Sequence, residues 1–219
     1  MISVKKKQVA LIVGGTGQFG LSLGNFLLRK NFEVNITTRN KEKNKKKIKK
    51  IISIHNLNIL NLKSIDNIIK KIKPNYIFYF AGQSSPAKSF YKKRETYLSN
   101  VVGCRHFLSV LKKNRSNCKF INAASCEMYG NIKGKIKIYS PKKPVSPYGY
   151  SKVKSFNITK KYREKYKLKG YNAIIFNSES FLRPNNYLIP KICIAALRAK
   201  KYQTKTKFGD LNISREWNW

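Results

Sequence analysis

Residues 8–20 read QVALIVGGTGQFG, and this stretch decides the fold. Its first six residues are mostly apolar and rich in β-branched side chains, as in a strand buried on both faces of a parallel sheet. Gly14, Gly17 and Gly20 follow at regular spacing, and residues 21–30 have the composition of a helix. A strand, a glycine-rich turn and a helix in this order predict a phosphate-binding unit.

The three glycines have separate expected roles in holding a dinucleotide. Gly14 permits a tight turn, Gly17 lets the backbone approach a pyrophosphate, and Gly20 lets the helix pack on the sheet. The helix N-terminus adds N–H groups and partial positive charge, which favour a phosphate at that place. An ordinary strand-to-helix turn is the alternative, and the strand and helix that flank the glycines favour nucleotide binding over it.

The end of the predicted second strand, residues 32–38, bears on the choice of dinucleotide. Enzymes that use NAD usually carry an acidic residue there to bind the ribose hydroxyl. This chain has Thr37-Thr38-Arg39-Asn40 and then a run of lysines. Arg39 without an acid beside it favours the 2′-phosphate of NADP. The other interpretation treats Arg39 as one more solvated cation.

The rest of the chain alternates strands and helices, which predicts an α/β fold with a Rossmann-like, doubly wound parallel sheet. Strands are predicted at residues 51–55, 76–80, 118–124 and 173–176, and helices at residues 64–73, 94–111 and 148–166. Ligands of such sheets gather at the carboxyl ends of the strands, so the segments that follow the strands are expected at one edge. Ala81 and Gly82 are small enough there to let a dinucleotide pass close to the backbone.

Two neighbouring segments carry groups for acid–base chemistry. Residues 124–130 (ASCEMYG) include Glu127, and residues 146–152 (SPYGYSK) include Tyr148 and Lys152. Tyr148 and Lys152 lie one helical turn apart on one face. The ammonium there can stabilise a phenolate that otherwise forms only at a pH of about 10. That pair suits removal of an alcohol proton while a hydride leaves to a nicotinamide, and Glu127 adds a second base that simple alcohol oxidation does not need.

The charge of the chain is extreme, with 47 Lys and Arg against 9 Asp and Glu, a net charge of +38. Such a charge is typical of proteins that bind nucleic acid or membrane surfaces. The lysines are scattered through every segment, and the dense block at residues 41–50 falls where a Rossmann fold has a surface helix or loop. We therefore expect a solvated surface without a nucleic-acid partner, and a polyanion-binding protein remains the alternative.

At 219 residues, 42% of them hydrophobic, the chain can build one α/β core and a partial extra lobe. It has no apolar run near the roughly 20 residues that span a bilayer, so no membrane partner is expected. Its four cysteines lack C-x-x-C spacing, and His55 and His106 are its only histidines. Neither a disulfide framework nor a metal site is expected, and a cytoplasmic location follows as the default.

Six segments, in chain order, resemble the GDP-mannose 4,6-dehydratase family of the extended short-chain dehydrogenase/reductase superfamily. They are GGTGQ at residues 14–18, AGQS at 81–84, SCEMYG at 125–130, the pair Tyr148 and Lys152, FNSES at 176–180, and REW at 215–217. The resemblance implies an NADP-binding Rossmann domain over residues 1–176, which includes the Tyr148 helix. Because family members continue well past the REW segment, residues 177–219 are expected to form an incomplete C-terminal substrate-binding lobe.

The resemblance also implies a reaction and its residues. GDP-mannose would be dehydrated to GDP-4-keto-6-deoxymannose, with a bound NADP that is recycled. Tyr148 with Lys152 would take the C4 hydroxyl proton, Ser125 would hydrogen-bond that oxygen, and Glu127 would remove the C5 proton. The implied cofactor-binding residues are Gly14, Gly17, Gln18, Gly20, Arg39, Asn58, Ala81, Gly82, Tyr148 and Lys152. The implied substrate-binding residues are Gln83, Ser84, Asn177, Arg183, Lys191 and Arg215.

Two alternatives to this activity stay open. One is another nucleotide-sugar epimerase or reductase of the same superfamily, and the other is a truncated cofactor-binding protein with little activity. The chain also departs from the family pattern at Cys126, where members usually have Ser, and at Asn58, where they have Asp. Since relatives assemble as dimers or tetramers, a homo-oligomer is expected.

Overall fold

The computed structural model describes two compact units of the chain, Met1–Ile175 and Phe176–Trp219. The described residues are 6–42, 48, 51–132, 134–185, 187–209 and 217–218. The lysine-rich block at 41–50 therefore lies mostly outside them, and so does Arg215. The expected roles, cofactor binding by residues 1–176 and substrate binding by residues 177–219, stay predictions.

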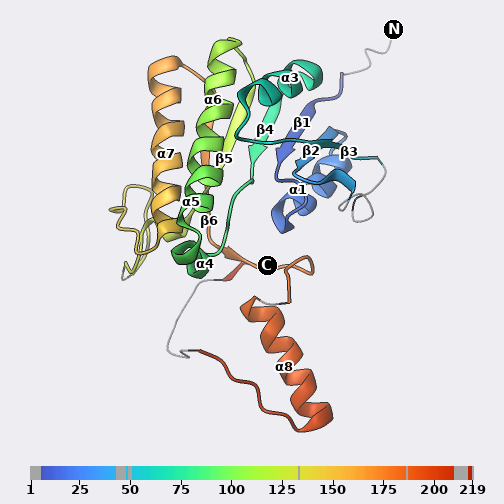
Figure 1. Ribbon diagram of the computed structural model, residues 1–219, viewed down its shortest axis with the longest axis vertical. Helices are drawn as coiled ribbons and strands as arrows, with labels where there is room; N and C mark the ends of the chain where they lie inside the picture. The colour runs from blue at the N-terminus through green and yellow to red at the C-terminus, as the bar shows by residue number, and fades with distance from the viewer. Residues whose placement is uncertain are drawn as a thin grey trace. The chain divides into compact units, whose positions relative to one another are not determined.

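The first unit is built on one six-stranded sheet with the order β3-β2-β1-β4-β5-β6 (Figure 1). Its strands are β1 Val9–Val13, β2 Glu33–Thr38, β3 Ser53–Asn56, β4 Tyr76–Tyr79, β5 Lys119–Ser125 and β6 Gly170–Ile175. All neighbours pair in parallel. The chain starts in the middle, runs outward through β2 and β3, and returns to continue at β4. This reversal between β1 and β4 confirms the predicted Rossmann-like, doubly wound fold.

The described α-helices of the first unit are α1 Gln18–Arg29, α3 Leu62–Ile72, α4 Pro86–Tyr91, α5 Lys93–Tyr97, α6 Gly103–Lys113 and α7 Pro147–Tyr166. Three of them, α3, α4 and α7, begin at a residue whose side chain caps the helix. The Asn61 side chain accepts a hydrogen bond from Ser64 N at the start of α3. The Ser146 hydroxyl does the same for Gly149 N at the start of α7, where Pro147 occupies the first turn. These are preferred residues for helix N-termini.

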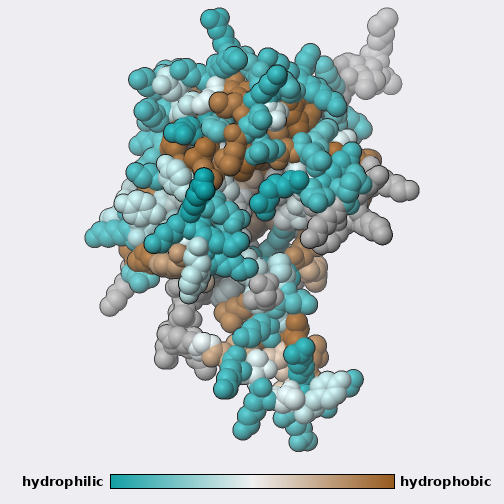
Figure 2. All heavy atoms as spheres, in the orientation of Figure 1, coloured by the Kyte–Doolittle hydropathy of each residue, from teal (hydrophilic) through white to brown (hydrophobic). Residues whose placement is uncertain are grey.

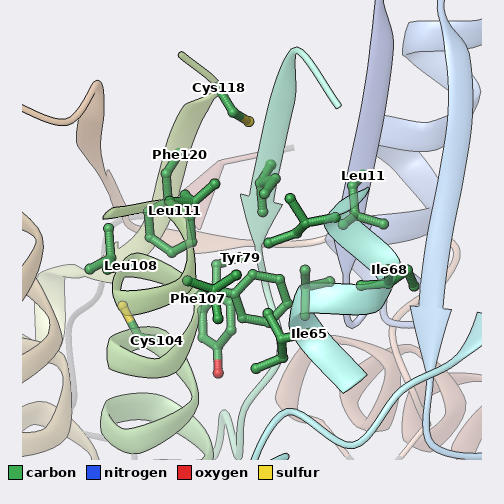
Figure 3. Close-up of a cluster of buried hydrophobic side chains, with 14 of the residues drawn as sticks. Leu11, Ile65, Ile68, Tyr79, Cys104, Phe107, Leu108, Leu111, Cys118 and Phe120 are labelled. Carbon is green, nitrogen blue, oxygen red and sulfur yellow. The ribbon is translucent and has the colours of Figure 1, made fainter. Parts of the chain in front are cut away.

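Two apolar layers enclose the sheet, because β1 is buried on both faces. Leu11 and Val13 belong to the cluster under α3 and α6, which includes Phe107 and Phe120 (Figure 3). Ala10 and Ile12 belong to the opposite cluster, with Val34 and Ile36 of β2 and Leu27 of α1. A strand with both faces buried is what its continuous apolar sequence predicts.

Two element predictions were wrong in detail. The predicted helix at residues 94–111 is divided into α5, a π-helical turn at Leu98–Val102, and α6. Strand β6 begins at Gly170 rather than at residue 173, because Phe120 of β5 pairs with Gly170 and extends the ladder over Gly170 and Asn172, which are weak strand formers. The short helix α4 was not predicted.

The second unit contains a two-stranded parallel ladder and one helix. Strand β7 (Asn177–Ser178) pairs with β8 (Trp217–Asn218), and helix α8 spans Leu188–Tyr202. None of the residues of α8 is buried.

The face of the molecule drawn in Figure 2 is largely covered by hydrophilic residues, as the composition leads one to expect. In the part of the chain that the structure describes, no helix combines the length and the apolar character needed to cross a bilayer.

Two glycines of α1 allow a matched test of the packing around the glycine turn. A Cβ on Gly20 would lie 2.5 Å from the Gly15 Cα, whereas a Cβ on Gly24 would make ordinary contacts of 3.5 Å with Ile52 and 3.7 Å with Ile12. We expect Gly20→Ala to lower the free energy of unfolding by about 1–3 kcal/mol. Gly24→Ala should raise it by up to about 1 kcal/mol, because alanine is the better helix former. Urea denaturation measures both, and equal effects would contradict the packing described.

Candidate active site

The glycine turn after β1 packs closely against its neighbours. Gly14 has a φ of +79°, and a Cβ on it would lie 2.7 Å from the Ala81 backbone. A side chain on Gly15 would collide with Ile36. The turn is therefore held closely between the ends of β2 and β4, which only glycine permits.

Gly17 differs, because it is open. The nearest atom to a Cβ on Gly17 is the Gly14 carbonyl oxygen at 3.6 Å, so a ligand can approach its backbone. Gly17 is also the N-cap of α1, whose first turn contains no acidic residue. The positive end of the helix is thus available to a phosphate. Gly20 was expected to let the helix pack on the sheet. The atoms nearest to a Cβ on it belong to Gly15, in the backbone of the turn itself.

Two polar residues expected to bind the cofactor, Arg39 and Asn58, follow β2 and β3. Arg39 is exposed directly after β2, and the described residues include no ion-pair partner for it. The loop backbone is fixed by Asn56 Oδ1, which accepts from Lys41 N at 2.7 Å. Asn58 is exposed, and its Oδ1 accepts from Leu60 N at 3.0 Å. The Asn58 side chain therefore also supports the turn that leads into α3.

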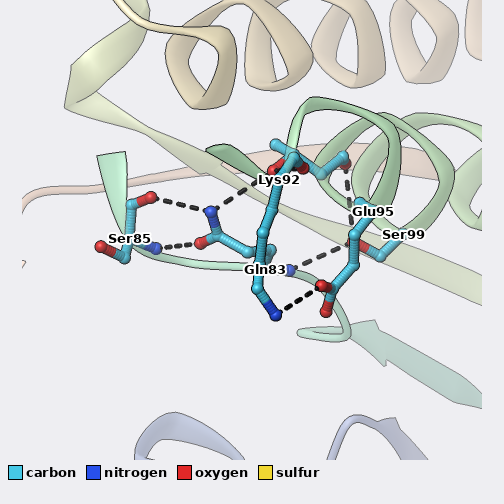
Figure 4. Close-up of polar contacts among 6 residues, drawn as sticks. Gln83, Ser85, Lys92, Glu95 and Ser99 are labelled. Atoms are coloured by element: carbon cyan, nitrogen blue, oxygen red, sulfur yellow. Dashed lines mark hydrogen bonds and ion pairs between the residues drawn. The ribbon is translucent and has the colours of Figure 1, made fainter. Parts of the chain in front are cut away.

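The segment after β4 is held by the side chain of Gln83 (Figure 4). Gln83 Nε2 donates to the Ser85 carbonyl at 2.9 Å and to Thr96 Oγ1 at 3.3 Å, while its Oε1 accepts from Ser85 N. Gln83 N donates to Ser99 Oγ at 3.2 Å. The amide expected to contact the substrate is thus engaged in shaping this loop, whereas the neighbouring Ser84 is exposed.

Asn100, which sequence reasoning missed, ties this loop to α7. Its Nδ2 donates to the Gln83 carbonyl at 3.1 Å and to Ser151 Oγ at 3.0 Å. Gly82, with a φ of +153°, leaves room for the Asn100 carboxamide, since a Cβ there would collide with Asn100 Oδ1. The sequence offered one signal for this role. Asn100 is a polar residue next to apolar ones in the middle of a predicted helix, three residues before Gly103.

Tyr79 of β4 stabilises the π-helical turn that carries Asn100. The Tyr79 hydroxyl donates to the Ser99 carbonyl at 2.6 Å. Complete burial raises the pKa of Tyr79 well above its usual value, so the hydroxyl stays a donor. π-helical turns are frequent at functional sites, where they redirect a side chain.

Strand β5 delivers Ser125 and Glu127 to the same edge of the sheet. Ser125 is the last residue of β5 and is buried. Its hydroxyl accepts from Glu127 N at 3.2 Å and so caps the short 3-10 turn Cys126–Met128. Met128 and Tyr129 are fully buried behind this turn, which fixes its position.

Gly149 brings α7 against that turn. A Cβ on Gly149 would lie 2.5 Å from the Glu127 carbonyl oxygen and 3.0 Å from the Pro144 Cβ. The absence of a side chain therefore lets the first turn of α7 lie directly on the backbone of Glu127. Tyr148, which directly precedes Gly149, is 9% exposed, and its backbone N donates to Ser89 Oγ of α4 at 3.1 Å.

Lys152 lies one turn along α7 from Tyr148 and is 8% exposed. Its Nζ donates to the Ala123 carbonyl of β5 at 2.8 Å and lies 5.5 Å from the centre of the Tyr148 ring. Burial lowers the pKa of Lys152 to about 8, and the neighbouring Cys104 opposes that shift. The amine is still mostly charged at neutral pH and faces the phenol.

Four of the residues expected to bind substrate belong to the second unit or lie beyond the described residues. Asn177 is in β7, and Lys191 Nζ donates to the Lys207 carbonyl at 3.1 Å. Arg183 Nε donates to Glu179 Oε1 at 3.2 Å. Arg215 lies outside the described residues. Among the described residues, no group of three or more His, Cys, Asp and Glu could hold a metal ion.

Known proteins resemble this chain over nearly its whole length. The model of a family described as GDP-mannose 4,6 dehydratase matches residues 11–219. GDP-mannose 4,6 dehydratase 1 of Arabidopsis thaliana is 33% identical over 99% of this chain and 64% of the plant protein. The human GDP-mannose 4,6 dehydratase is 31% identical over 97% of this chain and 62% of its own length. The chain thus spans less than two thirds of these relatives.

A solved structure shares the fold. UDP-N-acetylglucosamine 4-epimerase from Methanobrevibacter ruminantium superposes with a TM-score of 0.82 at 22% identity, covering 97% of this chain and 69% of the epimerase. The same sheet and helix arrangement therefore exists in a protein of experimentally known structure.

The burial of Lys152 predicts a specific pH dependence of stability. Its pKa is 10.5 in the unfolded chain and about 8 in the folded one, so folding disfavours the charged form. This cost is complete below the folded pKa and disappears as the pH rises toward the unfolded pKa. The stability of the wild type relative to Lys152→Met should therefore rise by up to about 3 kcal/mol over that interval.

Urea denaturation of both proteins across this pH range measures the difference. Lys154→Met, at an exposed position on the same helix, is the control and should show no such change. Parallel curves for the wild type and Lys152→Met would mean that the Lys152 amine is not desolvated.

Proposed function

The chain belongs to the GDP-mannose 4,6-dehydratase family, and from this premise we propose that it dehydrates GDP-mannose to GDP-4-keto-6-deoxymannose using bound NADP. Membership confirms the resemblance predicted from the six sequence segments. One observation carries the proposal: Gly149 lets the helix of Tyr148 and Lys152 lie directly on the turn of Glu127. Tyr148, whose phenolate can act as a base, and Glu127, whose carboxylate can act as a second base, are thereby brought to the same edge of the sheet.

Tyr148 acts first in the proposed reaction. Its phenolate oxygen removes the proton from the C4 hydroxyl of the sugar, and the charged Lys152 amine stabilises that phenolate. Ser125 accepts a hydrogen bond from Glu127 N, which leaves its own proton to donate to the C4 oxygen. When bound, the nicotinamide supplies the hydride acceptor for C4 and later returns the hydride at C6.

Glu127 separates this reaction from simple oxidation. A 4-keto group acidifies the hydrogen on C5. The Glu127 carboxylate removes that proton and passes it to the C6 hydroxyl, which leaves as water, and the proton that Tyr148 took from the C4 hydroxyl replaces it at C5 when the hydride is added at C6. The product is a 4-keto-6-deoxy sugar with no net oxidation. A reductase has no step that needs this carboxylate.

NADP is the proposed dinucleotide on account of Arg39. The open backbone at Gly17 and the positive end of α1 suit the pyrophosphate. Gly14, Gln18, Gly20, Ala81 and Gly82 frame the same place, and exposed Arg39 stands at the end of β2 with exposed Asn58 after β3. A guanidinium at that place suits a 2′-phosphate, which NAD lacks.

The proposal also covers the substrate-binding residues, the oligomeric state and the cellular location. Basic Arg183, Lys191 and Arg215 suit the pyrophosphate of a nucleotide sugar, with Asn177, Gln83 and Ser84 as polar contacts. A homo-oligomer and a cytoplasmic location are proposed with them. None of the four cysteines, all of which are among the described residues, forms a disulfide, which suits a reducing compartment.

The preference for NADP is tested at Arg39. We expect Arg39→Gln to weaken NADP binding by about tenfold and to leave NAD binding unchanged, since only the 2′-phosphate contact is lost. Isothermal titration with each dinucleotide measures both affinities. Arg29→Gln, which removes an exposed cation from the other end of α1, is the charge-matched control. Equal loss for both dinucleotides would contradict the assignment.

The dehydratase activity is tested at Glu127. The protein with NADP should convert GDP-mannose to the 4-keto-6-deoxy product without added reductant. Glu127→Gln should lower this turnover by about 100-fold to 10,000-fold while C4 oxidation still reduces the bound dinucleotide, seen in its near-ultraviolet absorbance. Tyr148→Phe should abolish both signals.

Glu164→Gln provides the matched control, because Glu164 is an exposed carboxylate on α7. Its activity should equal that of the wild type. Normal turnover by Glu127→Gln would instead favour an epimerase or reductase, and absence of both dinucleotide reduction and product in the wild type would overturn the proposed function.

A further inference from the structure

A pocket lies at the edge of the sheet opposite the proposed active site. Its volume is about 640 Å³, and its lining includes Pro74 and Tyr76 at the start of β4 and Lys119 at the start of β5. Ser125 stands at the other end of β5, a strand of seven residues, so about 20 Å separate the two places. The pocket therefore does not belong to the proposed active site.

Four lysines from three separate parts of the chain line this pocket. Lys70 is in the last turn of α3, Lys73 is its C-cap, Lys119 begins β5, and Lys169 precedes β6. Lysines on one exposed helix face need no ligand to explain them, because water solvates them. Lysines brought together around one hollow by three segments, the end of α3, the start of β5 and the residue before β6, are a different observation, since the fold itself assembles them.

The charge of the pocket is not balanced by the protein. No acidic side chain is among its lining residues in the described part of the chain. Asp66 lies beside it, bonded to Lys70 at 2.7 Å and to Asn114 at 2.7 Å. These hydrogen bonds lower the pKa of Asp66, which stays charged. Helices α3 and α6 end at this edge, and each end carries about half a negative charge. Against four lysines, about two positive charges remain.

The floor of the pocket is part of the sheet and is well ordered by hydrogen bonds. Asn75 N donates to the Val9 carbonyl at 2.8 Å, and Lys119 N donates to the Asn75 carbonyl at 2.9 Å. Asn75 Oδ1 accepts from Val9 N at 2.8 Å. Lys119 Nζ also lies over the Tyr76 ring and donates to the Tyr76 hydroxyl at 3.3 Å. At least one lysine is thus held in place before any ligand arrives.

Apolar surface accompanies these charges. Ile69, Pro74 and Cys118 contribute to the lining. In Figure 2, apolar surface is exposed between hydrophilic side chains in the upper part of the view, where Figure 1 draws the start of β4 between α3 and the end of α6. A volume of this size is within the range of small-molecule sites.

We propose that this pocket binds a small phosphorylated molecule that carries two linked phosphate groups on an organic body. Lysine binds phosphate as a point charge, and two such groups match the charge left over in the pocket. The organic body would contact the apolar lining. This inference is independent of the proposed dehydratase activity, because it uses none of its residues.

Inorganic pyrophosphate is a probe for the charged part of the site. Lysine acetylation is followed residue by residue by mass spectrometry, with and without pyrophosphate, at constant ionic strength. We expect Lys73, Lys119 and Lys169 to be protected, and Lys154 and Lys161, which are exposed on α7, to react as before. Protection at Lys152 would report the active site instead, so the two sites are distinguished in one measurement.

A double variant supplies the second arm of the test. Lys119→Gln with Lys169→Gln should weaken the pyrophosphate binding that protects Lys73 by about fivefold. Lys154→Gln with Lys161→Gln, which changes the net charge equally, should leave it unchanged. Equal weakening by both pairs, uniform protection of all exposed lysines, tighter binding of an RNA oligonucleotide than of pyrophosphate at these lysines, or no protection would each overturn the proposal.

Discussion

The site depends on one close contact, between the first turn of α7 and the backbone of Glu127. It exists because Gly149 has no side chain to separate them. Tyr148 and Lys152 flank Gly149 along α7, so their position relative to Glu127 and Ser125 follows from this contact. A helix displaced by the thickness of a methyl group would move Tyr148 and Lys152 away from the backbone of Glu127. The proposed chemistry thus depends on a residue that takes no part in it.

Buried polar residues hold α7 in that place. Asn122 of β5 donates to Asn172 of β6 at 2.8 Å, and Asn172 donates to the Phe156 carbonyl of α7 at 3.2 Å. Lys152 donates to the Ala123 carbonyl, and Asn100 reaches Ser151 from the π-helical turn. Apolar contacts alone would tolerate sliding of the helix, whereas hydrogen bonds in a low dielectric require particular partners at particular distances. We infer that these bonds determine the register of α7 on the sheet.

The elements predicted correctly from sequence are those whose signal is local. Strand β1 and the turn at Gly14 are determined by a continuous apolar run and by backbone conformations that glycine allows. The start of β6 and the π-helical turn at Leu98–Val102 depend on partners far along the chain, namely Phe120 for β6 and Tyr79 for the π-helical turn. The Tyr148–Lys152 pair was recognisable from spacing, but the role of Asn100 was not, because its partners come from two other elements.

The two edges of the sheet place opposite demands on charge. At the carboxyl edge, α1 presents its N-terminus, so an anion can be bound there by backbone groups with few cations. At the amino edge, α3 and α6 present their C-termini, and lysines in their last turns neutralise those ends. Two helix C-termini together carry about one negative charge, so about one positive charge is enough to neutralise both. The lysines at the amino edge carry more positive charge than that, and the fold brings them to one hollow from three separate segments, the end of α3, the start of β5 and the residue before β6.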